Sequence, residues 1–153
     1  PRGMGLRDDM LYKALRFRKA LDEEAGGRFK SNYIFLGDLN TMGMEYPYDR
    51  TIPAETELRR TDSRAKRYYG MVRLRKSHDV TWSGGSDSSY EPSNLDHVYA
   101  SEHLAFRHFR NASNEPVEVD VRGWVQEQTS EDKDKWIERY SDHSLLYFEV
   151  QKV

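Results

Sequence analysis

Three short polar motifs, each next to a run of residues typical of a buried strand, constrain this chain more than any other feature. They are GDLN at 37–40, SNLDH at 93–97 and SDHS at 141–144. The run 32–36 precedes the first motif, 98–101 follows the second and 145–150 follows the third. Because polar groups from distant sequence converge at strand ends on a rigid sheet, the pattern predicts one shared site.

The order GDLN, SNLDH, SDHS resembles the C-terminal half of the endonuclease/exonuclease/phosphatase superfamily. Members of this family, which include pancreatic deoxyribonuclease, share a four-layered αββα sandwich and cleave phosphoester bonds with a divalent metal, usually magnesium. The resemblance implies an α+β fold, mainly antiparallel sheet with outer helices. It covers essentially the whole chain, so residues 1–153 are expected to form the C-terminal portion of one such domain. A lone Gly-Asp-x-Asn would indicate only a turn.

The N-terminal half of the family supplies an Asn, a metal-binding Glu and a His that have no counterpart in this chain, which begins at Pro1. We therefore expect a fragment or a processed piece of a longer protein, with little activity by itself. An apolar sheet face or strand edge would then be exposed unless the missing N-terminal half or self-association covers it.

The resemblance implies roles for five residues. Asp38 would orient or deprotonate the attacking water, and Asn40 would hydrogen-bond the phosphoryl group. Asp142, together with Asp38 and Asn40, would serve the metal site, where Mg²⁺ needs only one or two carboxylates (Mn²⁺ and Ca²⁺ are alternatives). His143 would contact the scissile phosphate, and Asp96 would accept a hydrogen bond from its other ring nitrogen and fix its tautomer. Whether Asp38 or His143 is the general base stays open.

Each of these residues also has a purely structural alternative. Asp38 and Asn40 could form a turn after the strand, which is the commoner role of such residues. Asp142 could cap the start of the last strand, and His143 could be a half-buried surface imidazole. His97, which follows the orienting acid, is interpreted as a packing residue.

Composition sets limits but does not select a function. The chain has 153 residues, 37% hydrophobic and 33% charged, and a mean hydropathy of -0.93. It has no Cys, so neither a disulfide framework nor a thiolate zinc site can form. No apolar stretch reaches transmembrane length, and localisation stays open. A formal net charge of -2 neither requires nor excludes nucleic acid as a partner.

Charge is nevertheless segregated along the chain. Residues 49–78 carry nine Lys and Arg against four acids, whereas residues 115–142 carry nine acids against four bases. Tyr46, Tyr48, Tyr68 and Tyr69 lie within or beside the basic stretch, which could therefore hold phosphates and stack bases. The alternative is a solvated loop with ordinary surface charge.

Apolar periodicity predicts a helix over 6–25, with Asp8 and Asp9 in its first turn, and a short helix is also predicted over 132–140. Strands are predicted over 32–36, 95–101, 106–109, 117–124 and 144–150. Residues 41–92 predict loops with one or two short elements, among them a short strand over 80–82. We expect the strands next to the three motifs to lie in one mainly antiparallel sheet. Trp82 and Trp124 are interpreted as core or sheet-edge aromatics.

Two functions remain open. The first is a metal-dependent phosphodiesterase or phosphatase, a bacterial nuclease-like hydrolase acting on DNA, RNA, a nucleotide, a phospholipid head group or a sugar phosphate. The second is a non-enzymatic binding domain of the same fold that pairs with a separate N-terminal half. The intact set of Asp38, Asn40, Asp96, Asp142 and His143 favours the first, because a binding domain would not need all of them.

Overall fold

The computed structural model describes residues 2–43 and 52–153, with side chains described from residue 5 onward in the first of these ranges. These residues form a mixed α+β protein, which confirms the predicted class. The chain divides into two compact units. The first unit comprises Pro1–Arg73, His97–Leu104 and Val153, and the second comprises Leu74–Asp96 and Ala105–Lys152. In the described ranges, no helix is both long and apolar enough to cross a membrane.

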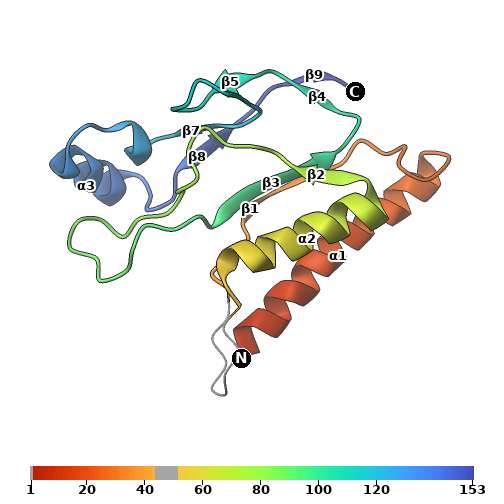
Figure 1. Cartoon of the computed structure of the whole chain (residues 1–153), viewed down its shortest axis with the longest axis horizontal. Helices are drawn as coiled ribbons and strands as arrows, with labels where there is room; N and C mark the ends of the chain where they lie inside the picture. The colour runs from red at the N-terminus through yellow and green to blue at the C-terminus, as the bar shows by residue number, and fades with distance from the viewer. Residues whose placement is uncertain (1, 44–51) are drawn as a thin grey trace. The chain divides into compact units, whose positions relative to one another are not determined.

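Two helices and a three-stranded sheet build the first unit (Figure 1). They are α1 (Arg2–Glu24), β1 (Ile34–Asp38), α2 (Ala54–Tyr69), β2 (Met71–Arg73) and β3 (Asp96–Ser101). The strand order is β1-β3-β2, and β2 pairs with β3 in antiparallel register, Met71 opposite Ser101. The central strand β3 is buried along its whole length, as a strand flanked on both sides should be.

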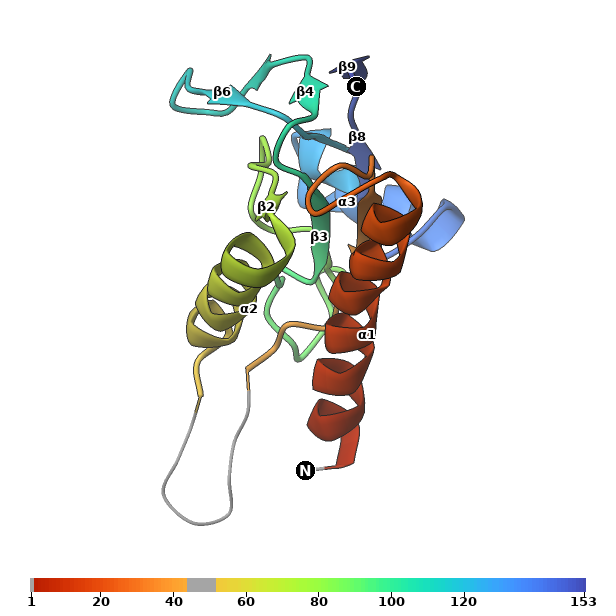
Figure 2. The ribbon, with the colours of Figure 1, turned by 90° about the vertical axis from the view of Figure 1, so that its right-hand side faces the viewer.

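The core of this unit lies where α1 and α2 pack side by side against the sheet (Figure 2). Leu15 of α1 and Ala65 of α2 meet Met71 of β2 and Tyr99 of β3, and all four are fully buried. The ring of Phe35 stacks on Tyr99 with centroids 5.0 Å apart. One helix layer on one sheet layer therefore encloses a continuous apolar core.

A buried cation joins the two helices at one end. Arg18 of α1 is fully buried, and its guanidinium donates to the carbonyl oxygens of Tyr69, at 2.6 Å, and Gly70 at the end of α2. Asp22 lies one helical turn further on, with a carboxylate oxygen 3.7 Å from Nε of Arg18. The same carboxylate accepts hydrogen bonds from the amide and hydroxyl of Ser31 at 2.9 and 2.6 Å. The cost of burying the charge of Arg18 is thus offset by a nearby carboxylate and by hydrogen bonds to backbone carbonyl groups.

Short strand pairs, a 3₁₀ turn and one helix build the second unit. They are β4 (Ala105–Phe106), β5 (Phe109–Arg110), β6 (Pro116–Val117), β7 (Asp120–Arg122), η1 (Trp124–Gln126), α3 (Ser130–Arg139), β8 (Leu145–Tyr147) and β9 (Val150–Lys152). The antiparallel pairs are β4 with β9, β5 with β6 and β7 with β8. Thr129 caps the N-terminus of helix α3, because its hydroxyl oxygen accepts a hydrogen bond from the amide of Asp132.

The helix predictions need two corrections. The helix predicted over 6–25 begins at Arg2, so Asp8 and Asp9 do not lie in its first turn. Residues 41–92 contain a long helix where only short elements were predicted, because α2 occupies sixteen of them. Its buried residues include the polar Glu57 and Thr61, so its inner face carries little apolar periodicity for a sequence pattern to reveal.

The strand predictions also need corrections. The strands predicted over 106–109, 117–124 and 144–150 are each interrupted, with a shift in register between Ala105 and Phe106 in the first. The short strand over 80–82 is reduced to isolated bridges at Trp82. The expectation of one sheet for the strands next to all three motifs is wrong: β1 and β3 share a sheet, but β8 pairs with β7. In the backbone, isolated bridges at Trp82 connect the SDHS segment to SNLDH, and these bridges do not extend into a ladder.

Candidate functional site

Residues 81–83 bring the second and third motifs together within the second unit. Trp82 and Ser93 exchange backbone hydrogen bonds, from the amide of each to the carbonyl of the other, at 3.0 and 2.9 Å. On the other side, the amide of Ser83 donates to the carbonyl of Asp142 at 3.0 Å, and Trp82 forms an isolated bridge with His143. This short segment therefore has SNLDH on one side and SDHS on the other.

Asp96 and His143 form a direct hydrogen bond. Oδ2 of Asp96 lies 2.8 Å from Nδ1 of His143, although the two residues are 47 positions apart in sequence. The Asp96 side chain is 9% exposed and the His143 side chain is 29% exposed, so the acid is shielded while the imidazole reaches solvent. Because a carboxylate accepts, the proton of this bond belongs to Nδ1. The predicted pairing of Asp96 with His143 is confirmed.

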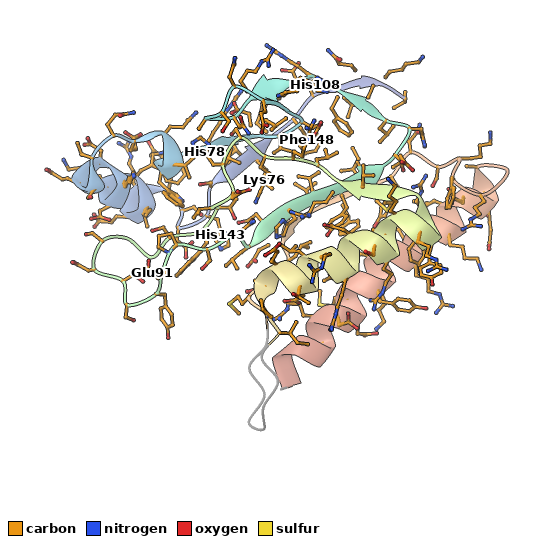
Figure 3. The ribbon with its side chains drawn as sticks, viewed as in Figure 1. Lys76, His78, Glu91, His108, His143 and Phe148 are labelled. Atoms are coloured by element: carbon orange, nitrogen blue, oxygen red, sulfur yellow. The ribbon has the colours of Figure 1, made fainter. Side chains whose placement is uncertain are left out.

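Lys76, labelled in Figure 3, supports the backbone of the second motif. Its buried ammonium group donates to the carbonyl oxygen of Asp96 at 2.7 Å and to the side-chain oxygen of Asn94 at 2.6 Å. A third bond reaches the carbonyl of Asp79 at 3.1 Å. Sequence analysis did not reveal this role, since Lys76 is one base among many in a basic stretch.

The side chain of Thr81 also binds the backbone of the SNLDH motif. It is fully buried, and its hydroxyl oxygen accepts hydrogen bonds from the amides of Leu95 and Asp96 at 3.2 and 3.0 Å. The orienting acid is therefore held at its amide by Thr81 and at its carbonyl by Lys76. Fixing both ends of the residue leaves its carboxylate little freedom relative to the imidazole.

Asp142 is oriented by an indole. Nε1 of Trp82 donates to Oδ2 of Asp142 at 2.8 Å. The interpretation of Trp82 as a sheet-edge aromatic is thus incomplete, because its side chain also contacts a candidate site residue. Trp124, by contrast, is buried at 6% exposure, as expected for a core aromatic.

His97 points into the packing of the first unit. Its Nε2 lies 2.8 Å from the hydroxyl of Thr41, and both residues are buried. This contact confirms the interpretation of His97 as a packing residue.

Asp38 and Asn40 form a compact turn at the end of β1. The amide of Asn40 donates to one carboxylate oxygen of Asp38 at 2.8 Å, and its side-chain amide donates to the other at 2.9 Å. Asn40 has a φ of 50°, in the left-handed region that Asn tolerates. The geometry is that of the turn-forming alternative, with both side chains exposed.

The described residues do not assemble a metal site in either unit. They contain no group of three or more His, Cys, Asp or Glu side chains that could hold an ion. Asp38 has Asn40 as its neighbour in the first unit, and Asp142 has Trp82 in the second. A Mg²⁺ ion held by one or two of these carboxylates would therefore take its remaining oxygens from water or from other groups.

Asp38 and Asn40 also line a groove between α1 and β1, with a volume of about 580 Å³. Its other walls are mostly apolar and include Leu6, Met10 and Leu36, which are 63, 62 and 50% exposed. In the described sheet β1 is an edge strand, with β3 as its neighbour. An apolar groove beside a strand edge is a surface that another chain segment can cover.

Comparison with known proteins does not identify a family or a function for this chain. No protein-family model matches the chain, no curated protein matches it, and no solved structure matches it.

Proposed function

We propose that this chain carries part of the active site of a metal-dependent hydrolase of phosphoester bonds, of the endonuclease/exonuclease/phosphatase type. The observation that supports the proposal is the 2.8 Å hydrogen bond between Asp96 and His143, two residues from separate motifs. A surface imidazole without a role would not need a shielded acid that is itself held by Lys76 and Thr81.

In this proposal Asp96 fixes the proton of His143 on Nδ1, so that Nε2 is directed to the phosphoryl group of the substrate. A charged imidazolium in this position stabilises the negative charge that develops on the phosphoryl oxygens. Asp38 orients the attacking water and Asn40 donates to the phosphoryl group from the turn after β1. The general base is either Asp38 or His143.

Magnesium is the proposed cofactor, with Mn²⁺ or Ca²⁺ as substitutes and Asp142 as a ligand. Because the described residues of neither unit group three such ligands, the remaining oxygens would come from water, the substrate and a further protein segment. The same segment would complete the four-layered sandwich, of which the helix and sheet layers of the first unit would be half. We therefore expect the chain alone to hydrolyse phosphoesters very slowly.

The test is a hydrolysis assay on a generic phosphodiester, bis(p-nitrophenyl) phosphate. The chain and a version extended by the residues encoded upstream are assayed side by side, with magnesium and with chelator. We expect activity in the extended version, abolished by chelator. Replacing Asp96→Asn should lower turnover by about 10³- to 10⁴-fold with little change in KM, as for loss of the orienting acid in a catalytic triad.

Asp79→Asn is the matched control, because the Asp79 side chain is exposed and only its carbonyl binds Lys76. This variant should keep full turnover. Unchanged turnover in Asp96→Asn would remove Asp96 from the mechanism. Equal activity of the chain and its extended version would show that no further segment is needed.

The groove beside β1 favours a second candidate, a binding domain that pairs with a separate chain through strand addition at this edge. The upstream coding sequence discriminates between the two. An Asn after a first strand and a Glu in a second strand region would support the enzyme, and their absence would support the binding domain.

A further inference from the structure

A second cavity in the first unit, separate from Asp38 and Asn40, combines aromatic rings with cations. Its volume is about 640 Å³. We call it the tyrosine cavity; α1, the loop after it and α2 contribute Tyr12, Lys19, Arg28, Phe29, Arg64 and Tyr68 to its walls. The volume lies within the range of about 300–1,000 Å³ that is usual for small-ligand sites.

The aromatic rings of the cavity remain accessible. Tyr68 is 57% exposed, Tyr12 41% and Phe29 36%. Phe29 lies over Gly70, where a Cβ would stand 2.9 Å from its ring, so the absence of a side chain at Gly70 makes room for the ring. Exposed rings on a wall of this kind offer flat surfaces for stacking.

Basic side chains outnumber acidic ones among the residues that line the cavity. Lys19, Arg28 and Arg64 line the cavity, and the guanidinium of Arg28 lies 4.4 Å from the ring centre of Phe29. Of the two acids, Asp22 accepts hydrogen bonds from the protein, and Glu23 is exposed. Arg64 also contacts Asp8 at 3.2 Å, but such an exposed pair contributes little and is easily exchanged.

The positive surface continues beyond the cavity along α2. Four of its exposed residues are basic, namely Arg59, Arg60, Lys66 and Arg67. Part of the basic stretch identified in the sequence is therefore the outer face of a helix and not a loop. Tyr46 and Tyr48, which the sequence placed beside this stretch, lie outside the described residues.

We propose that the tyrosine cavity and the basic face of α2 bind single-stranded nucleic acid. One base stacks on Tyr68 or Phe29, and Lys19, Arg28 and Arg64 hold the adjoining phosphates. Stacking on aromatic rings in a positively charged groove is how sequence-tolerant single-strand binding works. A strand of several nucleotides fits better than a free nucleotide, because the cations of α2 extend past the cavity.

Binding is measured by fluorescence anisotropy of a short labelled oligothymidylate, titrated with the chain at several salt concentrations. Affinity should fall as salt rises, because phosphate contacts release counterions. Tyr68→Ala should weaken binding about fivefold or more, whereas Tyr68→Phe, which keeps the ring, should bind as the parent does.

Tyr140→Ala is a closely matched control. Tyr140 is 62% exposed at the end of α3, and Arg139 lies over its ring at 5.2 Å, as Arg67 lies over that of Tyr68 at 5.4 Å. It is flanked by the acidic part of the chain, so its replacement should leave binding unchanged. Arg28→Gln should reduce the slope of log affinity against log salt by about 0.7, and Arg139→Gln should not change it.

This proposal stands apart from hydrolysis, because none of Asp38, Asn40, Asp96, Asp142 and His143 lines the tyrosine cavity. Equal losses in Tyr68→Ala and Tyr140→Ala would overturn it. So would competition by thymidine monophosphate as effective as that by the oligonucleotide. Binding to vesicles of anionic lipid without binding to the oligonucleotide would assign the basic face to a membrane surface instead.

Discussion

Each of the two units contains a buried cation that binds backbone carbonyl groups. In the first unit, Arg18 is fully buried and binds Tyr69 and Gly70 at the end of α2. In the second, Lys76 is 8% exposed and binds the backbone of Asp96 and the side chain of Asn94. One cation joins two helices, whereas the other positions an acid of the candidate site.

The difference reflects what surrounds each cation. The first unit has long helices packed on a sheet, so its geometry is secured by an apolar core as well as by Arg18. The second unit has two-stranded sheets of two or three residues a strand, and such pairs are marginal in isolation. Its motif loops therefore depend on individual hydrogen bonds. Replacing Lys76 should therefore change the geometry of the candidate site, whereas replacing Arg18 should destabilise the fold.

The largest effect is expected for Arg18→Met. This change leaves the carboxylate of Asp22 and two carbonyl groups without their buried cation, which should lower the free energy of unfolding by about 3–5 kcal/mol. Urea denaturation measures the loss. Arg16→Met on the exposed side of the same helix should stay within about 0.5 kcal/mol of the parent. A loss for Arg18→Met as small as that of this control would show that Arg18 does not hold α1 to α2.

Lys76→Met should lower the free energy of unfolding less, by about 2–3 kcal/mol, because three oxygens in the second unit, those of Asp79, Asn94 and Asp96, lose their donor. The sharper expectation concerns the site: the NMR signal of the His143 ring should broaden or split as Asp96 loses its support. Lys152→Met, at an exposed position of β9, serves as the control. An unchanged His143 signal in a destabilised Lys76→Met variant would make Lys76 a purely structural residue.

Asp22→Asn should have the smallest effect and one that depends on pH. Burial alone would raise the pKa of Asp22, but hydrogen bonds from the Ser31 hydroxyl and from the amides of Ser31 and Phe29, with the charge of Arg18, lower it overall. Its charge therefore stabilises the fold above a pH of about 3.9, and this contribution is lost as pH falls through the lowered pKa. The variant should be about 1–2 kcal/mol less stable at neutral pH.

Denaturation midpoints of parent and Asp22→Asn, followed from neutral pH into acid, test the sign. The gap between them should narrow as the solution becomes more acidic. A gap that widens in acid would mean that the pKa of Asp22 is raised in the folded chain.

How much the sequence could predict differs between the two units. The strand of β3 and the helices α1 and α3 follow from apolar spacing, whereas α2 does not, because it buries Glu57 and Thr61 where a pattern expects apolar residues. The breaks between β4 and β5 and between β8 and β9 are set by pairing with distant partners, which spacing cannot show.

The pairing of Asp96 with His143 was predictable only from the resemblance of their motifs to a known family, because two residues 47 positions apart carry no local signal for it. The supporting contacts of Lys76 and Thr81 were not predictable, since a buried Lys looks like a surface Lys in sequence. At GDLN the sequence allowed both a turn and a site, and the structure shows the turn geometry.

The central claim is that Asp96 holds His143 through Nδ1, and long-range ¹H–¹⁵N correlation of the His143 ring tests it most directly. The account predicts that Nδ1 carries a proton in the folded chain whether the ring is neutral or charged. The neutral ring should lose this preference for a proton on Nδ1 in Asp96→Asn and keep it in Asp79→Asn. A neutral His143 ring protonated on Nε2, or an identical pattern in Asp96→Asn, would contradict the account.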